Sequence, residues 1–543
     1  MGELSRAEQR RADTLSRLKN EHWDLLVIGG GISGAGVLRE AARRGWKCAL
    51  IEQRDFAWGT SSRSSKMVHG GLRYLKEGQV SLTRHAVQER ERLMHEAPEL
   101  IEPLSFLFAD CQGRKPGRWL FQLGLWVYDR MAGRRSHRYM DADTARLLAP
   151  GLAPPGLRGA MTYDDAVTDD ARLVQRVLAE AELDGGLAIN YVGADALLRV
   201  DGRVQGVGAR DVETGESFEV KARAVVNATG AWADQLRGGV GGKPMLRPLR
   251  GSHLVLPAWR LPVAQAVSVF HPEDGRPVYF YPWEGVTLIG TTDLDHSGDL
   301  NMEACITPDE VRYLLAAAND QFPGAQVTRA DVTACYAGVR PVVADDSGSA
   351  SKASRDHVAL QESGLVTLTG GKLTTFRLMA QDALALAAPL AGKNFQPDNA
   401  PVFRAIDSIL TRATAPFNHR MRARYGVRAA EFAAMAQADE RDCISGTRTL
   451  WIELRLAAEH EQVVHLDDLL LRRTRLGLLL PHGAMQHMDR IRALCQPLLN
   501  WDDAQWHAEL ARYTDLIQRY YSLPEPDVLA PDVLLAEAHW EPS

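Results

Sequence analysis

The sequence predicts an α/β plus α+β protein, with one domain on a parallel sheet, a second on an antiparallel sheet, and a helical C-terminal domain. Three observations predict this class. Residues 23–52 run from an apolar stretch through a glycine-rich turn and a helical stretch to a second apolar stretch, which is the pattern of a βαβ unit. Residues 245–335 contain short β-rich runs separated by prolines, which is typical of antiparallel strands. From about residue 399 helix formers dominate.

Length and composition describe an ordinary protein of several domains. A chain of 543 residues is too long for one hydrophobic core. The net charge of −6 gives no general attraction to nucleic acid, so we expect no nucleic-acid partner. The six cysteines are scattered without zinc spacing, and we expect buried reduced thiols. Residues 1–22 lack the apolar core of a secretory signal, and no run of about 18 apolar residues predicts a spanning helix.

The βαβ unit carries a dinucleotide-binding fingerprint. Its first apolar run is followed at once by Gly29, Gly31 and Gly34, which fit G-x-G-x-x-G. The first glycine permits the tight turn, the second lets the backbone approach a pyrophosphate, and the third lets helix and strand pack closely. The helix, expected over residues 37–44, points its N-terminus at the phosphates, and Glu52 can accept hydrogen bonds from a ribose diol. The alternative is a glycine-rich turn without a ligand.

The next stretch, residues 54–75, mixes hydroxyl residues and glycines with Lys66, His69, Arg73 and Tyr74. Hydroxyl and backbone N–H groups suit contacts with phosphate, and the other side chains suit an anionic substrate that is oxidised. A flexible surface loop is the alternative.

Within this stretch, TSSRSSKMVHGGLRYL after a dinucleotide fingerprint resembles the FAD-dependent glycerol-3-phosphate dehydrogenases, flavoproteins with the D-amino-acid-oxidase-like fold. The resemblance extends over roughly residues 23–380 and, more loosely, over the helical tail.

Later motifs match the same family in the expected order. Residues 224–232 form an apolar strand that ends in Ala-Thr-Gly, and RGSHLVLP places His253 at the head of a strand. YAGVRP supplies Arg340 and KASRDH supplies Arg355. VTLTGGKLTTFR supplies Lys372 between a double glycine and the start of a helix. For any one of these cations the alternative is a position on the surface.

The resemblance implies FAD as the cofactor, and the residues themselves predict no metal site. In this family the residue after a short strand, here Val192, gives backbone contacts to the adenine. Residues 293–304 imitate the spacing of a calcium-binding loop, but they follow a strand and end in Ala304 where a bidentate Glu is needed. The implied FAD contacts are Gly29, Gly31, Ser33, Gly34, Glu52, Thr60, Ser61, Ser62, Ser65, Lys66, His69, Gly70, Val192, Ala228, Gly230, Gly371, Lys372, Leu373 and Thr374.

The activity that the resemblance implies is oxidation of sn-glycerol 3-phosphate to dihydroxyacetone phosphate, with hydride transfer to FAD and electrons passed to a membrane quinone. A phosphate dianion needs fixed cations, and a hydroxyl proton needs a base of near-neutral pKa, which suits histidine. Spacing does not choose between the two candidate bases. The implied catalytic residues are His69, His253, Arg340 and Lys372. The implied substrate-binding residues are Arg73, Tyr74, Arg340, Arg355 and Lys372.

Three rival functions stay open at this point. A glycerol-phosphate oxidase of the same fold would pass the electrons to oxygen. An amine or amino-acid oxidase would need a carboxylate clamp rather than three arginines. A scaffold that binds nucleotide for structure only would not need the histidines, arginines and lysine that the motifs retain.

The expected domains interleave along the chain. We expect the Rossmann-like FAD-binding domain in residues 20–80, 155–235 and 336–395, and the substrate domain in residues 81–154 and 236–335. The remaining residues, 396–543, form the helical C-terminal domain, for which the sequence indicates no catalytic motif.

Residues 113–135 are the candidate segment for binding to a membrane surface. They combine Trp119, Phe121 and Trp126 with flanking arginines, so they form either a core helix of the substrate domain or an interfacial helix. A quinone-reducing enzyme without a spanning helix must dock on the bilayer surface. We therefore expect a cytoplasmic protein attached peripherally to inner-membrane lipids of the cell membrane, and a possible homodimer.

Overall fold

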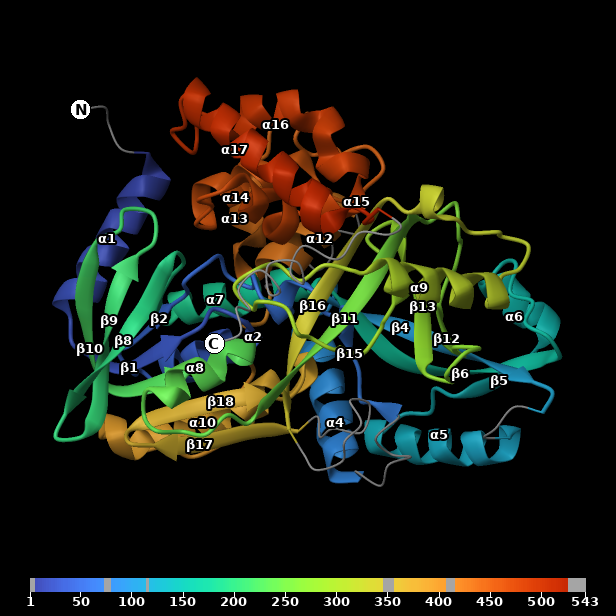
Figure 1. The fold of residues 1–543 in the computed structure, drawn as a ribbon, viewed down its shortest axis with the longest axis horizontal. Helices are drawn as coiled ribbons and strands as arrows, with labels where there is room; N and C mark the ends of the chain where they lie inside the picture. Colours follow the sequence, from blue (N-terminus) through green and yellow to red (C-terminus); the bar gives the residue numbers. More distant parts are fainter. Residues whose placement is uncertain (1–4, 73–79, 114–116, 345–355, 407–415, 526–543) are drawn as a thin grey trace, which may run out of the picture.

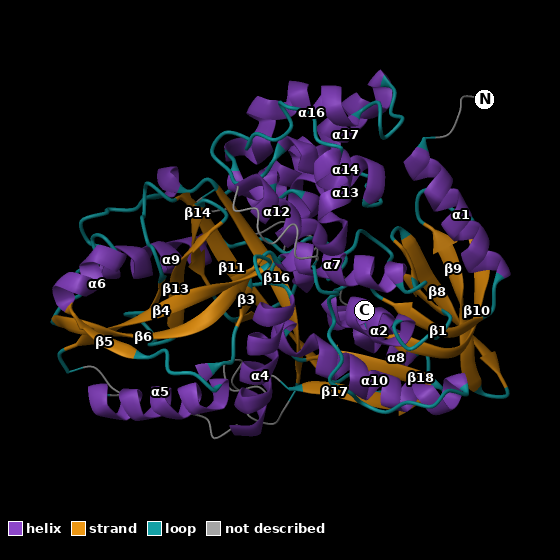
Figure 2. Cartoon of the chain, turned by 180° about the vertical axis from the view of Figure 1, so that it is seen from behind, coloured by secondary structure: helices purple, strands orange, loops and turns teal. Residues whose placement is uncertain are grey.

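The computed structural model describes residues 5–72, 80–113, 117–344, 356–406 and 416–525. Two β-sheets lie side by side, and the helical C-terminal domain packs over the junction between them (Figure 1). The same three parts are seen from behind in Figure 2. The expected architecture is therefore present.

The first sheet is the mostly parallel core. Its strands are β1 (Trp23–Ile28), β2 (Cys48–Ile51), β7 (Leu187–Ile189), β8 (Val192–Val200), β9 (Arg203–Asp211), β10 (Ser217–Asn227), β17 (His357–Glu362) and β18 (Leu365–Gly370). The order β17-β18-β10-β1-β2-β7 is parallel from β18 onward, and β8 and β9 extend it through β10. Because these strands are buried on both faces, residues 25–28 of β1 and all of β2 form continuous apolar runs.

Helices cover this sheet and fix the glycine-rich turn. They are α1 (Arg6–Asn20), α2 (Ile32–Ala42), α7 (Asp170–Leu183), α8 (Ala233–Gly238) and α10 (Phe376–Ala391). Helix α2 packs between α7 and α10. It begins at Ile32, five residues before the expected start at residue 37, because the turn glycines enter the first helical turn and the N–H of Ala35 donates to the carbonyl of Gly31 at 2.9 Å.

The second sheet forms the substrate side. Its strands are β3 (Met67–Val68), β4 (Ile101–Cys111), β5 (Arg138–Asp141), β6 (Leu157–Thr168), β11 (Leu246–Pro257), β12 (Ala266–Phe270), β13 (Pro277–Trp283), β14 (Val286–Gly290), β15 (Leu294–Asp295) and β16 (Ala334–Val343). The order is β15-β11-β14-β13-β12-β4-β6-β3, with β16 beside β11 and β5 beside β6. All of these pairs are antiparallel except β12 with β4, which is parallel.

Three strands of the second sheet fall wholly or mostly in ranges that the sequence assigned to the FAD-binding domain. Strand β3 lies within residues 20–80, β6 within residues 155–235, and most of β16 within residues 336–395. Strand pairing is set by contacts between distant residues, which motif order along the chain does not reveal. The chain leaves the second sheet for the first at the end of β6, at Thr168, and again at the end of β16, at Val343.

Helices α4 (Val80–Glu96), α5 (Arg118–Ala132), α6 (Ala142–Leu148) and α9 (Pro308–Gln321) flank the second sheet. Helix α5 lies at the opposite end of the molecule from the C-terminal helices in both views (Figures 1 and 2). Its inner face buries Leu125 and Tyr128, whereas Trp119 is 77% and Trp126 49% exposed. The helix thus has one packed face and one exposed aromatic face.

The C-terminal domain is helical, as expected. Its elements are α12 (Pro416–Tyr425), α13 (Ala429–Ala434), α14 (Trp451–His460), the π-helix η6 (Asp468–Arg473), α15 (Leu476–Leu479), α16 (Met488–Cys495), α17 (Asp503–Leu516) and the π-helix η8 (Ile517–Tyr521). Its short 3-10 helices are η5 (Gly426–Arg428) and η7 (Pro481–His487). In the rest of the described chain the 3-10 helices are η1 (Thr60–Ser62), η2 (Gly230–Trp232), η3 (Arg329–Asp331) and η4 (Leu373–Thr375). None of the described helices is long and apolar enough to cross a bilayer.

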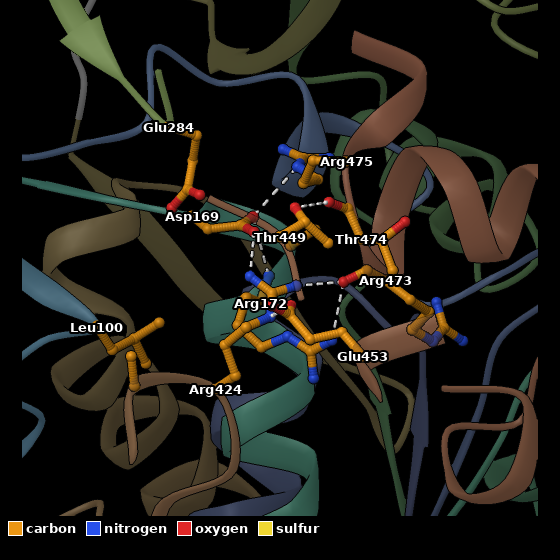
Figure 3. Close-up of polar contacts among 12 residues, drawn as sticks. Leu100, Asp169, Arg172, Glu284, Arg424, Thr449, Glu453, Arg473, Thr474 and Arg475 are labelled. Atoms are coloured by element: carbon orange, nitrogen blue, oxygen red, sulfur yellow. Dashed lines mark hydrogen bonds and ion pairs between the residues drawn. The ribbon is translucent and has the colours of Figure 1, made fainter. Parts of the chain in front are cut away.

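A buried ion network joins this domain to the first one (Figure 3). Asp169 caps α7 by accepting a hydrogen bond from the N–H of Arg172, and its carboxylate also pairs with Arg475 at 3.1 Å and with Arg424 at 3.2 Å. Arg424 in turn pairs with Glu453 of α14. Removing one partner would leave an uncompensated buried charge, so the network holds the two domains in one arrangement.

All six cysteines are free thiols, as expected for a reduced protein. Five of them are buried, whereas Cys443 is exposed, contrary to the expectation that all would be buried. The described residues include no cluster of side chains able to hold a metal ion.

Candidate active site

A cavity of about 610 Å³ lies between the two sheets. The ends of β1, β2, β10 and β18 form one side of it, where the carboxyl ends of parallel strands in such folds meet a ligand. Residues of β6, β13 and β16 form the other side. The cavity thus joins the dinucleotide fingerprint to the substrate sheet.

The glycines of the fingerprint are required by the geometry. Gly29 has a φ of +111°, and a Cβ there would come within 2.6 Å of the carbonyl oxygen of Ala228. A Cβ at Gly34 would lie 1.9 Å from the carbonyl oxygen of Gly29, so any side chain would push α2 off the strand. At Gly31, a Cβ would face only Ser61 at 3.2 Å, which leaves backbone open to the cavity. This cradle fits a pyrophosphate.

The carboxylate expected at the ribose is in place. Glu52 lines the cavity, and its oxygens accept hydrogen bonds from the N–H of Gly30 at 2.6 Å and of Arg54 at 2.8 Å. Burial raises the pKa of Glu52 above its usual value. Val192 lines the same end, and its N–H donates to the carbonyl of Glu52 at 2.8 Å.

Most of the expected FAD contacts line this cavity. Those that do are Gly29, Gly31, Ser33, Glu52, Thr60, Ser61, Ser65, His69, Val192, Ala228, Gly230, Gly371, Lys372, Leu373 and Thr374. Four lie behind its wall: Gly34, Ser62, Lys66 and Gly70.

Lys66 is directed into the protein. Its ammonium is fully buried and donates to the carbonyl of Ser62 at 3.0 Å and to Asp170 at 3.1 Å. It also lies 4.9 Å from the ring centre of Trp283 and 4.6 Å from that of Tyr336. Burial lowers the pKa of Lys66 to about 8. The ammonium therefore holds the hydroxyl-rich loop in place rather than facing a ligand.

The two candidate bases occupy different positions. His69 follows β3 and lines the cavity, and Thr374 holds its backbone by accepting from its N–H at 3.1 Å and donating to its carbonyl at 3.2 Å. His253 lies in the middle of β11 rather than at its head, is 1% exposed, and meets Ser65 through Nε2 at 2.9 Å. Burial lowers the pKa of His253 well below its usual value, which keeps the ring neutral.

Arg340 lines the substrate side. Its guanidinium donates to the carboxylate of Asp293 at 2.8 Å and to the hydroxyl of Thr291 at 3.1 Å. The glycine of the RGSH motif has a physical reason here, because a Cβ on Gly251 would come within 2.3 Å of Arg340 Nη2. Lys372 lines the cavity at the start of η4. The other expected substrate contacts, Arg73, Tyr74 and Arg355, lie outside the described residues.

Asp165, Arg276 and Trp58 are among the cavity-lining residues that sequence reasoning missed. Asp165 lies in an acidic stretch whose repeated aspartates hid it, and Arg276 precedes β13 without a recognisable motif. The guanidinium groups of Arg54 and Arg63 lie 4.2 Å and 4.8 Å from the ring centre of Trp58. Of these three residues, only Asp165 lies in a stretch that stands out in the sequence, the repeated aspartates before α7.

Known proteins resemble the chain over nearly its full length. "Glycerol-3-phosphate dehydrogenase 2" of Mycobacterium tuberculosis (strain ATCC 25618 / H37Rv) is 36% identical over 558 residues, which cover 97% of this chain and 94% of the relative. "Aerobic glycerol-3-phosphate dehydrogenase" of Staphylococcus aureus (strain MRSA252) is 32% identical over 540 residues, which cover 94% and 96%.

Solved structures agree with the fold. A glycerol-3-phosphate dehydrogenase from Bacillus halodurans complexed with FAD matches with a TM-score of 0.77 at 26% identity, covering 97% of this chain and 99% of that one. The L-alpha-glycerophosphate oxidase of Mycoplasma pneumoniae matches with a TM-score of 0.54 at 19% identity, covering 71% and 99%, and shares the fold alone.

Two family models cover the chain in succession. One, described as "FAD dependent oxidoreductase", matches residues 24–377, and the other, described as "C-terminal domain of alpha-glycerophosphate oxidase", matches residues 378–506. The first match spans the glycine cradle, the buried carboxylate and the hydroxyl-rich loop that together fit FAD. The chain therefore belongs to the family of FAD-dependent oxidoreductases, and its cofactor is FAD.

Proposed function

We propose that the protein oxidises sn-glycerol 3-phosphate to dihydroxyacetone phosphate and passes the electrons to a membrane quinone. The observation that carries the proposal is that one cavity joins the dinucleotide cradle to His69, Lys372 and Arg340. Such a cavity provides a base and two cations beside a redox cofactor, which is what an anionic alcohol substrate needs. The names of the relatives that match nearly the whole chain point to the same substrate.

In the proposed reaction, bound FAD supplies the hydride acceptor for C2. His69 takes the proton of the C2 hydroxyl, since it lines the cavity while His253 reaches it only through Ser65. Arg340 holds the phosphate, because a guanidinium fork matches phosphate oxygens. Lys372 stabilises the negative charge that develops as the hydroxyl is deprotonated. Arg73, Tyr74 and Arg355 remain proposed substrate contacts on the strength of their motifs.

Aromatic side chains keep the substrate side of the cavity dry. Phe106 and Tyr163 stack with ring centres 5.3 Å apart, and Tyr279 meets Phe106 edge-on at 6.0 Å. All three line the cavity. Excluding water strengthens the charge interactions between the substrate and the cations around it.

For the electron acceptor we propose a quinone reached at the cytoplasmic face of the cell membrane, where the protein would bind peripherally. Helix α5 supports this, because its exposed face carries Trp119, Leu120, Leu123 and Trp126. Arg118 and Arg130 flank these side chains and supply charge for anionic head groups. The expected homodimer remains a proposal.

The test is anaerobic reduction of the purified flavoprotein. We expect glycerol 3-phosphate to bleach the flavin absorbance fully and glycerol at the same concentration to leave it unchanged. Bleaching by both, or by neither, would contradict the proposed substrate.

The match to the C-terminal domain of an alpha-glycerophosphate oxidase favours oxygen as the rival acceptor. Peroxide formed in stoichiometric amounts during aerobic turnover would establish that rival.

A further inference from the structure

A buried carboxylate lies in the cavity without a role in the reaction described so far. Asp165 on β6 is 3% exposed and lines the cavity together with Tyr163, two residues earlier. Alternate residues of a strand point to the same face, so the carboxylate belongs to the same wall as the aromatic side chains. A charge buried this deeply is expensive unless it is paired and hydrogen-bonded.

One oxygen of this carboxylate is fixed by three donors from three parts of the chain. Asp165 Oδ1 accepts from the N–H of Gly70 at 3.0 Å, from the hydroxyl of Tyr128 at 2.7 Å, and from the guanidinium of Arg90. Burial raises the pKa of Tyr128 well above its usual value, so its hydroxyl stays protonated and donates. A Cβ at Gly70 would come within 2.3 Å of the Tyr128 hydroxyl, which explains the glycine beside His69. The carboxylate is therefore held rigidly, and one of its three donors is the residue that follows the proposed base.

The other oxygen is left for a ligand. Among the described residues none hydrogen-bonds Asp165 Oδ2, although the side chain lines the cavity. A rigid acceptor beside aromatic rings is what binds the hydroxyl groups of a small polyol. Arg340 lines the same cavity from strand β16. The cavity thus offers a cation from one strand and a carboxylate from another.

We propose that Asp165 accepts a hydrogen bond from the terminal hydroxyl of the substrate, opposite the phosphate end, and selects a vicinal diol. This rests on the proposed function and adds a determinant of specificity to it. The arrangement orients a molecule with an anionic end and a hydroxyl end in one direction, which places C2 between them beside His69.

The test compares two substrates that differ by one hydroxyl. Propane-1,2-diol 1-phosphate keeps the phosphate and the C2 hydroxyl of glycerol 3-phosphate but lacks the terminal one. We expect Asp165→Asn to lower kcat/KM for glycerol 3-phosphate by about ten- to a hundredfold, because a donor replaces the acceptor at Oδ2, and to leave kcat/KM for the analogue unchanged. The matched control is Asp164→Asn, since Asp164 pairs with Ser105 and Arg134 and does not line the cavity.

Each other outcome has its own meaning. Equal losses of kcat/KM with both substrates would overturn the proposal. If the acid limb of the kcat/KM profile against pH were also flattened, Asp165 would be the base. If the melting temperature were also lowered, the role of Asp165 would be structural. The wild-type protein gives a test that needs no variant. If it oxidises both substrates equally well, no residue reads the terminal hydroxyl and the proposal fails. If it oxidises neither, the proposed function itself has failed.

Discussion

Replacing Gly251 with alanine tests the position of Arg340 without altering a charged residue. The new methyl group would lie 2.3 Å from Arg340 Nη2 and 2.7 Å from Thr291 Oγ1. Both atoms are at the ends of side chains, so we expect the guanidinium to swing away while β11 keeps its pairing. The displaced guanidinium would then lose its alignment with the substrate phosphate.

The size of the effect follows from the contact that is lost. A hydrogen bond to a charged group contributes about 1.5–3 kcal/mol, and about 1.4 kcal/mol corresponds to a factor of ten in rate. Gly251→Ala should therefore lower kcat/KM for glycerol 3-phosphate by about ten- to a hundredfold. We expect most of the loss in KM, because the phosphate is bound in the ground state as well as in the transition state.

Steady-state kinetics with an artificial electron acceptor measures this, together with FAD content by absorbance. Gly208→Ala serves as the control, since it lies in strand β9 and its Cβ would meet only Ala196 at an ordinary 3.6 Å. The control should keep wild-type kinetics. A Gly251→Ala protein with full FAD and unchanged kcat/KM would refute the assignment of Arg340 to the phosphate.

Three further predictions follow from the same structure. Gly34→Ala should yield colourless protein, because its Cβ would lie 1.9 Å from a backbone oxygen, and normal flavin content would contradict the assignment of the cradle. His253 stays neutral in the folded protein, whereas in the unfolded chain it takes up a proton below about pH 6.5. The free energy of unfolding therefore decreases as the pH is lowered through that range, by up to about 1.4 kcal/mol per pH unit. His253→Gln should make the melting temperature depend less on pH over the same range, and an unchanged dependence would refute this. Replacing Trp119 and Trp126 with serine should reduce co-sedimentation with anionic vesicles while leaving FAD content and soluble activity intact; binding equal to wild type would place the membrane contact elsewhere.

The local parts of the fold could be read from the sequence. The strand, glycine turn, helix and second strand of residues 23–52 depend on neighbours within one βαβ unit, and β1 and β2 are confirmed where they were expected. The pairing of β16 with β11 could not be read, since it joins residues about 85 positions apart in the chain. For the same reason His253 was placed at the head of a strand when it lies in the middle of β11.

In the site, too, local motifs could be predicted from the sequence, whereas contacts between distant residues could not. His69, Lys372 and Arg340, which the sequence motifs singled out, line one cavity, and their roles stay predictions. Asp165 was not found, because its significance depends on Gly70, which is about 95 residues away in the sequence. Lys66 is part of the motif, yet its ammonium is directed inward, where Asp170 and two aromatic rings offset part of the cost of burying its charge.

The ion pairs that join the C-terminal domain to the rest make it an inseparable part of the flavoprotein. Asp55, three residues after Glu52, is fully buried and receives both Arg472 and Arg473 of η6. A truncated chain that ends before α12 would keep this aspartate but lose both arginines, and would uncover it within a few residues of the FAD cradle. The C-terminal domain and the loop that follows β2 therefore share one buried interior, and neither is expected to keep its arrangement without the other.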